Sequence, residues 1–159
     1  KPIRGNGLGW SERYKYWDGI LEDYSPGDVT WRSKTQLLFA NGLAMLIVAR
    51  ELDCQYIWNA HAPAARSEGV SDALVDAIRD KQALPAMAAD ETAIVNFGRE
   101  FFEKHKVDGE TFQAALDQFG SQYLVELTAL MGHYAQTAFF LNAFEVELPE
   151  DRTEEVLPV

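Results

Sequence analysis

The stretch Leu37-Leu-Phe-Ala-Asn-Gly-Leu-Ala-Met-Leu-Ile-Val-Ala49 decides the fold. Its residues are apolar at nearly every position, so a helix built from them would be apolar on all sides rather than along one stripe. Such a helix must be surrounded by other elements. The run is well short of the roughly 20 residues that span a bilayer, and Asn41 and Gly42 interrupt it. We therefore expect a buried core helix, from about Val29 to Leu52, and no membrane association.

Helical spacing and turn residues predict the elements around this core helix. Gly69 is a typical helix terminator, and Ser71 and Asp108 are placed to cap the helices that follow them. No segment shows the strict alternation of a strand. Besides the core helix, we expect helices over about 10–23, 54–68, 89–106, 108–120 and 121–144, and one more directly after Ser71.

These elements predict an all-α, single-domain bundle of about six to seven helices. A chain of 159 residues fits one domain. We divide it into an N-terminal segment with a short aromatic helix (1–28), a helical domain (29–144) and an acidic C-terminal tail (145–159).

Composition excludes several classes of protein. The net charge of −11 would repel a phosphate backbone, so we expect no nucleic-acid partner. Cys54 is the only cysteine, which leaves no internal disulfide and no cysteine-based zinc site, and we expect no metal. The N-terminus lacks a signal-peptide pattern, so a soluble, cytoplasmic protein is expected.

One face of the predicted helix 54–68 carries an unusual set of side chains. Cys54, Trp58 and His61 are spaced at i, i+4 and i+7, which aligns a thiol, an indole and an imidazole. Histidine titrates near neutrality and is the commonest general acid or base. The same spacing also fits a core-facing stripe with a satisfied histidine, and spacing alone does not separate the two interpretations.

Other candidate residues lie nearby in the sequence or on the predicted helix 121–144. His133 and Tyr134 offer a second imidazole and a phenol, provided that this helix packs against the helix of His61. Arg50 and Arg66 flank the His61 segment and could bind a substrate carboxylate through paired hydrogen bonds. Surface arginines usually serve only solvation, so that alternative stays open.

Seven short motifs follow one another along the chain: Met45–Arg50, Tyr56–Pro63, Arg66–Ser71, Ala89–Glu91, Leu124–Leu127, Gly132–Tyr134 and Leu141–Asn142. In this order they resemble the carboxymuconolactone decarboxylase family, which belongs to the wider alkylhydroperoxidase D-like group. The resemblance covers roughly residues 37–149. It implies a helical protomer that assembles into a homo-oligomer, commonly a trimer or hexamer, and it implies no cofactor.

The departures from the family pattern are informative. Ile57 stands where the redox branch has its second cysteine, so the dithiol of that branch is missing. Ile57 and Gly42 also stand where decarboxylase-like sequences have glutamates. His61 matches the family histidine, which favours a functional role for it. Cys54 is better explained as a small buried hydrophobic residue.

We therefore expect a cofactor-free lyase or isomerase that acts on a small carboxylated lactone or another enolisable acid. The family's namesake decarboxylates such a lactone in aromatic compound catabolism. His61 would move the proton, Trp58 and Tyr56 would shape the pocket with Cys54, and His133 or Tyr134 would supply a second proton. The alternative is a non-catalytic oligomeric binding or scaffold protein. A thiol-dependent peroxidase or reductase is the weakest of the three.

Overall fold

The computed structural model describes residues 38–159, and every regular element in that range is a helix. The all-α prediction is confirmed for this part of the chain. The expected helix 10–23 and the beginning of the core helix lie outside the described residues. No helix within 38–159 is long and apolar enough to cross a membrane. The helices are α2 (Leu38–Glu51), α3 (Gln55–Ser67), α4 (Asp72–Arg79), α5 (Ala89–Lys104) and α6 (Gly109–Ala143).

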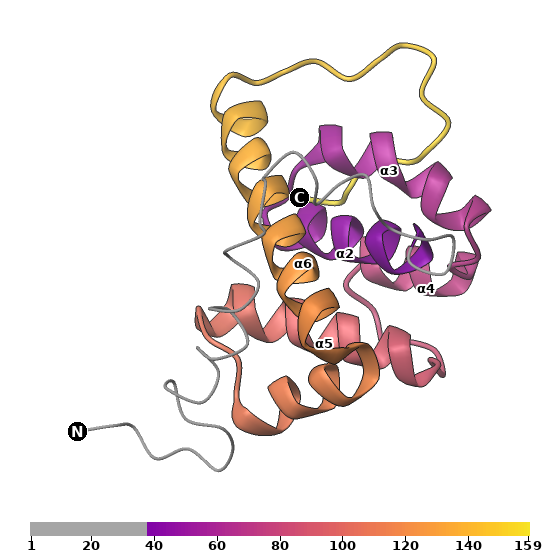
Figure 1. The fold of residues 1–159 in the computed structure, drawn as a ribbon. Helices are drawn as coiled ribbons and strands as arrows, with labels where there is room; N and C mark the ends of the chain where they lie inside the picture. Colours follow the sequence, from indigo (N-terminus) through magenta and orange to yellow (C-terminus); the bar gives the residue numbers. More distant parts are fainter. Residues whose placement is uncertain (1–37) are drawn as a thin grey trace.

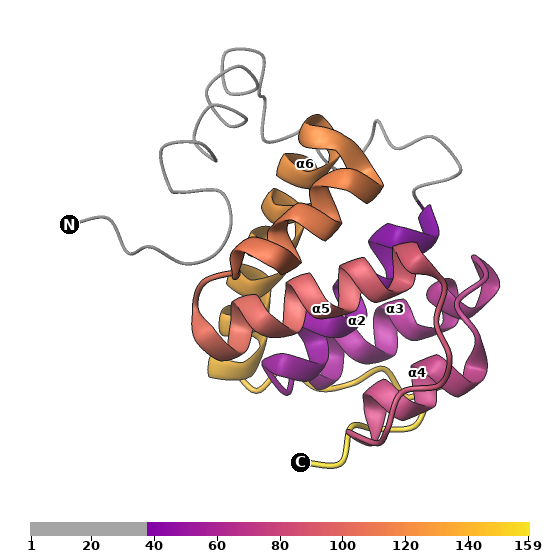
Figure 2. The ribbon, with the colours of Figure 1, turned by 90° about the horizontal axis from the view of Figure 1, so that it is seen from below.

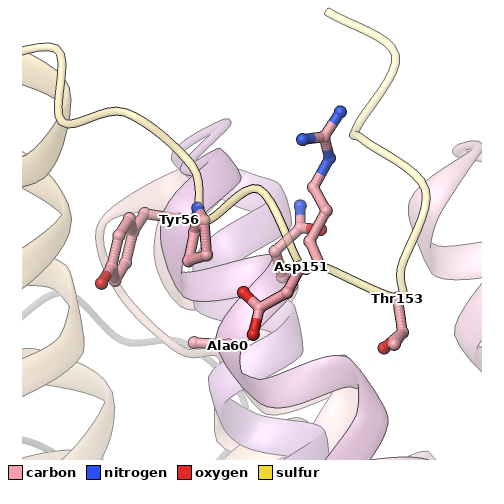
Figure 3. Close-up of a pocket in the computed structure, with 7 residues that line it drawn as sticks. Tyr56, Ala60, Asp151 and Thr153 are labelled. Carbon is pink, nitrogen blue, oxygen red and sulfur yellow. The ribbon is translucent and has the colours of Figure 1, made fainter.

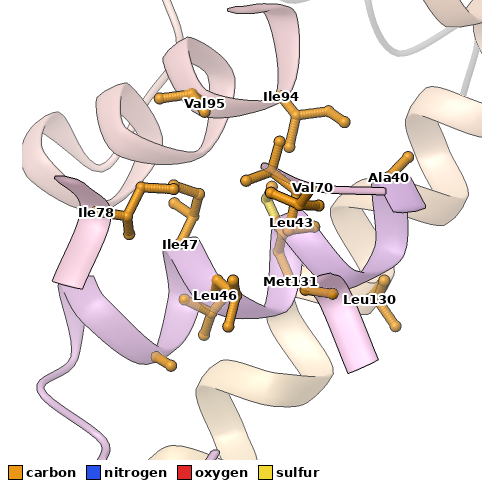
Figure 4. Packing of buried hydrophobic residues seen from close by; sticks show 14 of the residues in the cluster. Ala40, Leu43, Leu46, Ile47, Val70, Ile78, Ile94, Val95, Leu130 and Met131 are labelled. Carbon is orange, nitrogen blue, oxygen red and sulfur yellow. The ribbon is translucent and has the colours of Figure 1, made fainter. Parts of the chain in front are cut away.

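Helix α2 is the centre of the bundle, as its composition predicts. It contacts all four other described helices, and Figures 1 and 2 show α3 and α5 beside it with α6 crossing them. Leu43, Leu46 and Ile47 have no exposed surface. Figure 4 shows them packed among side chains from α5 and α6, including Ile94 and Met131. Each such buried side chain stabilises the fold by about 1.5–3 kcal/mol.

Gly98 allows α5 to approach α2 and α6 closely. A Cβ atom on this residue would lie 2.8 Å from Cγ2 of Ile47 and 3.1 Å from Cε of Met131. The first distance is shorter than carbon atoms tolerate, and the β-branched Ile47 has little rotamer freedom to move away. A small residue is therefore required where the three helices meet.

The helix boundaries agree with the predicted turn chemistry at one junction. Gly69, just after α3, adopts a left-handed φ of 110°. The hydroxyl of Ser71 accepts a hydrogen bond from the backbone N–H of Leu74 at 3.3 Å, which caps α4. Both predictions are confirmed.

The break predicted at Gly120 is present. The two expected helices meet within α6 at a kink at Gly120, whose φ of 76° and ψ of 168° are not helical. Asp108 is the N-cap residue of α6, as predicted, but its side chain makes no capping hydrogen bond. Its carboxylate instead accepts a hydrogen bond from Nζ of Lys104 at 3.0 Å.

The C-terminal segment 145–159 folds back over its own chain. Figure 1 shows it leaving the end of α6, arching across to α3 and ending near α2. Leu157 is only 2% exposed and belongs to the core. The side-chain amide of Gln55 donates to the carbonyl oxygen of Leu157 at 2.8 Å and accepts from its N–H at 2.7 Å. The tail is thus fixed to the bundle by both apolar burial and paired hydrogen bonds.

Candidate functional site

The structure brings His61 of α3 against Tyr134 of α6. Their ring centroids are 5.0 Å apart and the ring planes are nearly perpendicular, at 88°. This edge-to-face arrangement is a favoured geometry for aromatic rings. Both side chains are partly buried. The pairing fulfils the condition set by the sequence, that the helix of Tyr134 must pack against the helix of His61.

Burial controls the protonation of both groups. It lowers the pKa of the His61 imidazole, because the charged form loses solvation. It raises the pKa of the Tyr134 phenol for the same reason, since there the charged form is the deprotonated one. At neutral pH the site therefore combines a neutral imidazole, which can accept a proton, with a phenol that can donate one.

His133 lies beside this pair but faces solvent. Its ring centroid is 5.5 Å from that of Tyr134, with the planes at 87° to each other. Its side chain is exposed. His133 could therefore exchange protons with water at the edge of the site, whereas His61 lies deeper.

Cys54 and Trp58 belong to the core rather than to an open surface. Neither has any exposed area. Burial raises the pKa of the Cys54 thiol, which keeps it protonated and a poor nucleophile. The indole Nε1 of Trp58 is buried and has no hydrogen-bond partner among residues 38–159.

Tyr56 lies away from the His61 pair. It lines a separate hollow between α3 and the C-terminal tail, shown in Figure 3. Five positions separate Tyr56 from His61, which is more than one helical turn and directs the two side chains to different sides of α3. The structure does not join them in one pocket.

Both candidate arginines are engaged within the chain. The buried guanidinium of Arg50 donates to Asp53 at 2.7 Å and to the carbonyl oxygen of Pro158 at 3.0 Å. Arg66 is held by three carboxylates, those of Asp72, Asp76 and Glu154. In this structure the two arginines hold the C-terminal tail, and Arg66 also holds the junction between α3 and α4.

Glu68 is a residue that sequence reasoning missed. It is the C-terminal cap residue of α3, and its carboxylate lies against Gly42, where an added Cβ would be 3.1 Å from Oε2 and 3.2 Å from Cα of Ala65. Burial raises the pKa of the Glu68 carboxyl group, and its side chain has no hydrogen bond or ion pair within the described range that would offset this effect. In the sequence only its spacing indicated this position, since Glu68 follows His61 by about two helical turns and so lies on the same side of α3. Gly42 thus faces a carboxylate instead of carrying one.

The described residues contain no arrangement of three or more His, Cys, Asp or Glu side chains that could hold a metal ion. Comparisons of the chain with protein-family models, with curated proteins and with solved structures found no match.

Proposed function

We propose that the protein is a cofactor-free lyase or isomerase, similar to carboxymuconolactone decarboxylases, that acts on a small carboxylated lactone or another enolisable acid. The observation that carries this proposal is the contact between His61 and Tyr134. A base and a proton donor from two different helices are adjacent, and burial keeps each in the protonation state that the reaction requires.

In the proposed isomerisation, the neutral imidazole of His61 removes a proton from the carbon next to the substrate carbonyl. The bonding electrons move into the carbonyl and form an enolate, whose oxygen accepts a hydrogen bond from Tyr134. The imidazolium then returns the proton at another carbon of the conjugated system. His133, at the exposed edge, would exchange protons with solvent.

In the proposed decarboxylation, the bond to the carboxylate breaks and carbon dioxide leaves. The electron pair moves into the conjugated lactone carbonyl and forms an enolate. His61 takes up a proton from solvent through His133 at the exposed edge, and the resulting imidazolium gives that proton to carbon to form the new C–H bond. The lactone itself accepts the electrons, so this sequence needs neither a metal nor an oxidant.

Assembly and location are part of the same proposal. We expect a cytoplasmic homo-oligomer, a trimer or hexamer if the family resemblance holds. Three exposed phenylalanines near the end of α6 support an interface between copies: Phe139, Phe140 and Phe144.

The test is turnover of a panel of carboxylated γ-lactones by the full chain, followed by ultraviolet absorbance and by carbon dioxide release. His61→Ala should reduce kcat at least about 100-fold, because a positioned general base contributes about 10² to 10⁴. His105→Ala is the matched control, since His105 is exposed at the end of α5 and should tolerate the change. Circular dichroism should give the same helical content for all three proteins. Undiminished turnover by His61→Ala would exclude His61 as the base.

A non-catalytic oligomeric binding protein is the second candidate. It is favoured by one observation: no carboxylate within the described range pairs with His61, so nothing strengthens the imidazole as a base. NMR separates the candidates. A lactone acid that shifts the His61 resonances without being converted would support the binding protein, whereas conversion would support the enzyme.

A further inference from the structure

The end of the C-terminal tail is held in the way that proteins hold a bound extended peptide. The Leu157 side chain is 2% exposed and packs in the core. Its backbone N–H and C=O both pair with the side-chain amide of Gln55, at 2.7 and 2.8 Å, and Arg50 donates to the carbonyl oxygen of Pro158 at 3.0 Å. Backbone hydrogen bonds together with a buried side chain are the usual basis of peptide recognition. The tail is therefore bound as a separate peptide ligand would be.

Charge complementarity adds to this recognition. Glu154 pairs with Arg66 of α3 at 3.1 Å, and Glu155 pairs with Arg79 of α4 at 2.9 Å. The segment 148–159 contains four acidic residues and one arginine. A surface that presents arginines attracts such a segment, whether the segment comes from the same chain or from an identical one. We call the residues that hold the tail the tail-binding surface: Arg50, Gln55, Arg66 and Arg79.

The part of the tail before these contacts serves as a connection. Residues 145–153 are exposed except for Leu148, which is partly buried, and Figure 1 shows them as an arch from the end of α6 to α3. The chain from Leu148 to Glu154 can span up to about 20 Å when extended. Two packed helices lie only about 8–10 Å apart. The arch is thus long enough to lead to a neighbouring copy, and the contacts with a tail-binding surface would be the same there.

The turn at the start of the tail is strained. After α6, the N–H of Glu145 donates to the carbonyl of Asn142 at 3.3 Å, and the N–H of Val146 donates to that of Leu141 at 3.1 Å. This pair of bonds usually places glycine at the position of Glu145, because the backbone there is left-handed. Glu145 has a φ of 48°, which is unfavourable for a residue with a Cβ. If α6 instead continued to the residues before Pro149, the strain would disappear and the tail would point away from its own copy.

The strained turn lies at the surface through which we expect copies to meet. Phe144 directly precedes Glu145 and is 76% exposed, and Phe139 and Phe140 are exposed in the turn of helix before it. The stretch from Leu127 to Phe144 has no charged side chain, so no charge repels an identical copy here. Copies in contact at this end of α6 hold their two turns close together, where a tail can pass from one copy to the other.

From these observations we propose that identical copies exchange their C-terminal tails. Helix α6 then continues through Glu145, and residues 149–159 of one copy occupy the tail-binding surface of another. The exchange keeps the contacts of the tail, removes the strained turn and adds the aromatic contact, so it is favoured as the protein concentration rises. The inference rests on the homo-oligomer of the proposed function but not on the chemistry of His61.

A spin label on the tail tests the exchange in the full chain. Val159→Cys provides the attachment point, because Val159 is 86% exposed, whereas Cys54 is fully buried and should not react. The spin-labelled chain is mixed with ¹⁵N-labelled wild type, diluted so that the copies redistribute, and concentrated again. We expect the spin label to broaden the amide signals of Arg50 and Gln55 in the ¹⁵N-labelled copies. Leu157→Asp in the spin-labelled chain is the matched control and should leave these signals sharp, because a charged side chain does not enter the core.

Two substitutions at the turn provide a second test. Glu145→Gly relieves the strain of the closed turn, so it should raise the dissociation constant of the assembly at least about fivefold. Glu145→Ala removes the same charge but keeps the strain, and should not weaken the assembly. Sedimentation velocity measures both.

The outcomes separate the exchange from the proposed function. Assemblies in which the ¹⁵N signals stay sharp, or equal dissociation constants for the two Glu145 variants, would overturn the exchange and leave the assembly and the reaction in place. A monomeric wild-type chain would overturn the exchange together with the assembly. Failure to convert any lactone would count against the reaction alone, because the broadening does not depend on turnover.

Discussion

His61 is the residue whose environment leads to the most direct prediction. Burial lowers its pKa below the ordinary value of 6.5, so the unfolded chain binds this proton more tightly than the folded protein. The free energy of unfolding must then fall as the pH is lowered through 6.5 to the folded pKa, whereas well above 6.5 His61 adds no pH dependence. We expect an NMR titration midpoint for His61 below 6.5, and a weaker decline in acid stability in His61→Gln. A midpoint above 6.5 would indicate an acidic partner for the imidazole and contradict the neutral base.

For single residues, the sequence predicts contacts between residues that are close in the chain better than contacts between distant ones. Helical spacing predicts that Trp58 and His61 lie on neighbouring parts of one face, and the pairing of His61 with Tyr134 required only that two apolar faces meet. The distant partners of Arg66 and Arg50 could not be inferred in the same way. Glu154 is 88 positions from Arg66 and Pro158 is 108 positions from Arg50, and only the folded tail brings them close.

Among the elements, the C-terminal tail differs most from the expectation, because it is fixed to the bundle. Its acidic residues and prolines are typical of an exposed segment, and most of its side chains are indeed exposed. Leu157 is the apolar part of its attachment, with a buried side chain and two backbone hydrogen bonds to Gln55. The ion pair of Glu154 with Arg66 and the hydrogen bond from Arg50 to the carbonyl of Pro158 add to it. Sequence periodicity cannot reveal an apolar anchor that consists of one residue.

This anchor can be tested by a matched pair of substitutions. Leu157→Ala should lower the free energy of unfolding by about 2–5 kcal/mol, because it leaves a cavity in the core. Val156→Ala, at a neighbouring position that is 47% exposed, should change it by no more than about 0.5 kcal/mol. Urea denaturation measures both values, and hydrogen exchange at the Leu157 amide reports whether the tail detaches locally. Equal stability of the two variants would mean that the tail is not fixed in solution.

For the whole molecule, the distribution of charge is as informative as its sum. The chain carries a net charge of −11, which opposes contact between identical copies. The second half of helix α6 is the exception, because the stretch from Leu127 to Phe144 contains no Asp, Glu, Lys or Arg. Near its end Phe139, Phe140 and Phe144 are 69%, 58% and 76% exposed. Together they offer roughly 300–500 Å² of aromatic surface, about half of the area that one partner buries in a typical interface.

An uncharged face is where two like-charged copies can approach without repulsion, so the homo-oligomer proposed above should form through these phenylalanines. The double variant Phe139→Asp/Phe140→Asp should raise the dissociation constant at least about tenfold, because it buries charge in the contact. Phe101→Asp, which places one carboxylate at a partly exposed phenylalanine on α5, should leave the assembly intact. Sedimentation velocity at several protein concentrations measures all three proteins. A wild-type chain that sediments as a monomer would contradict the prediction, and dissociation by Phe101→Asp alone would move the interface to α5.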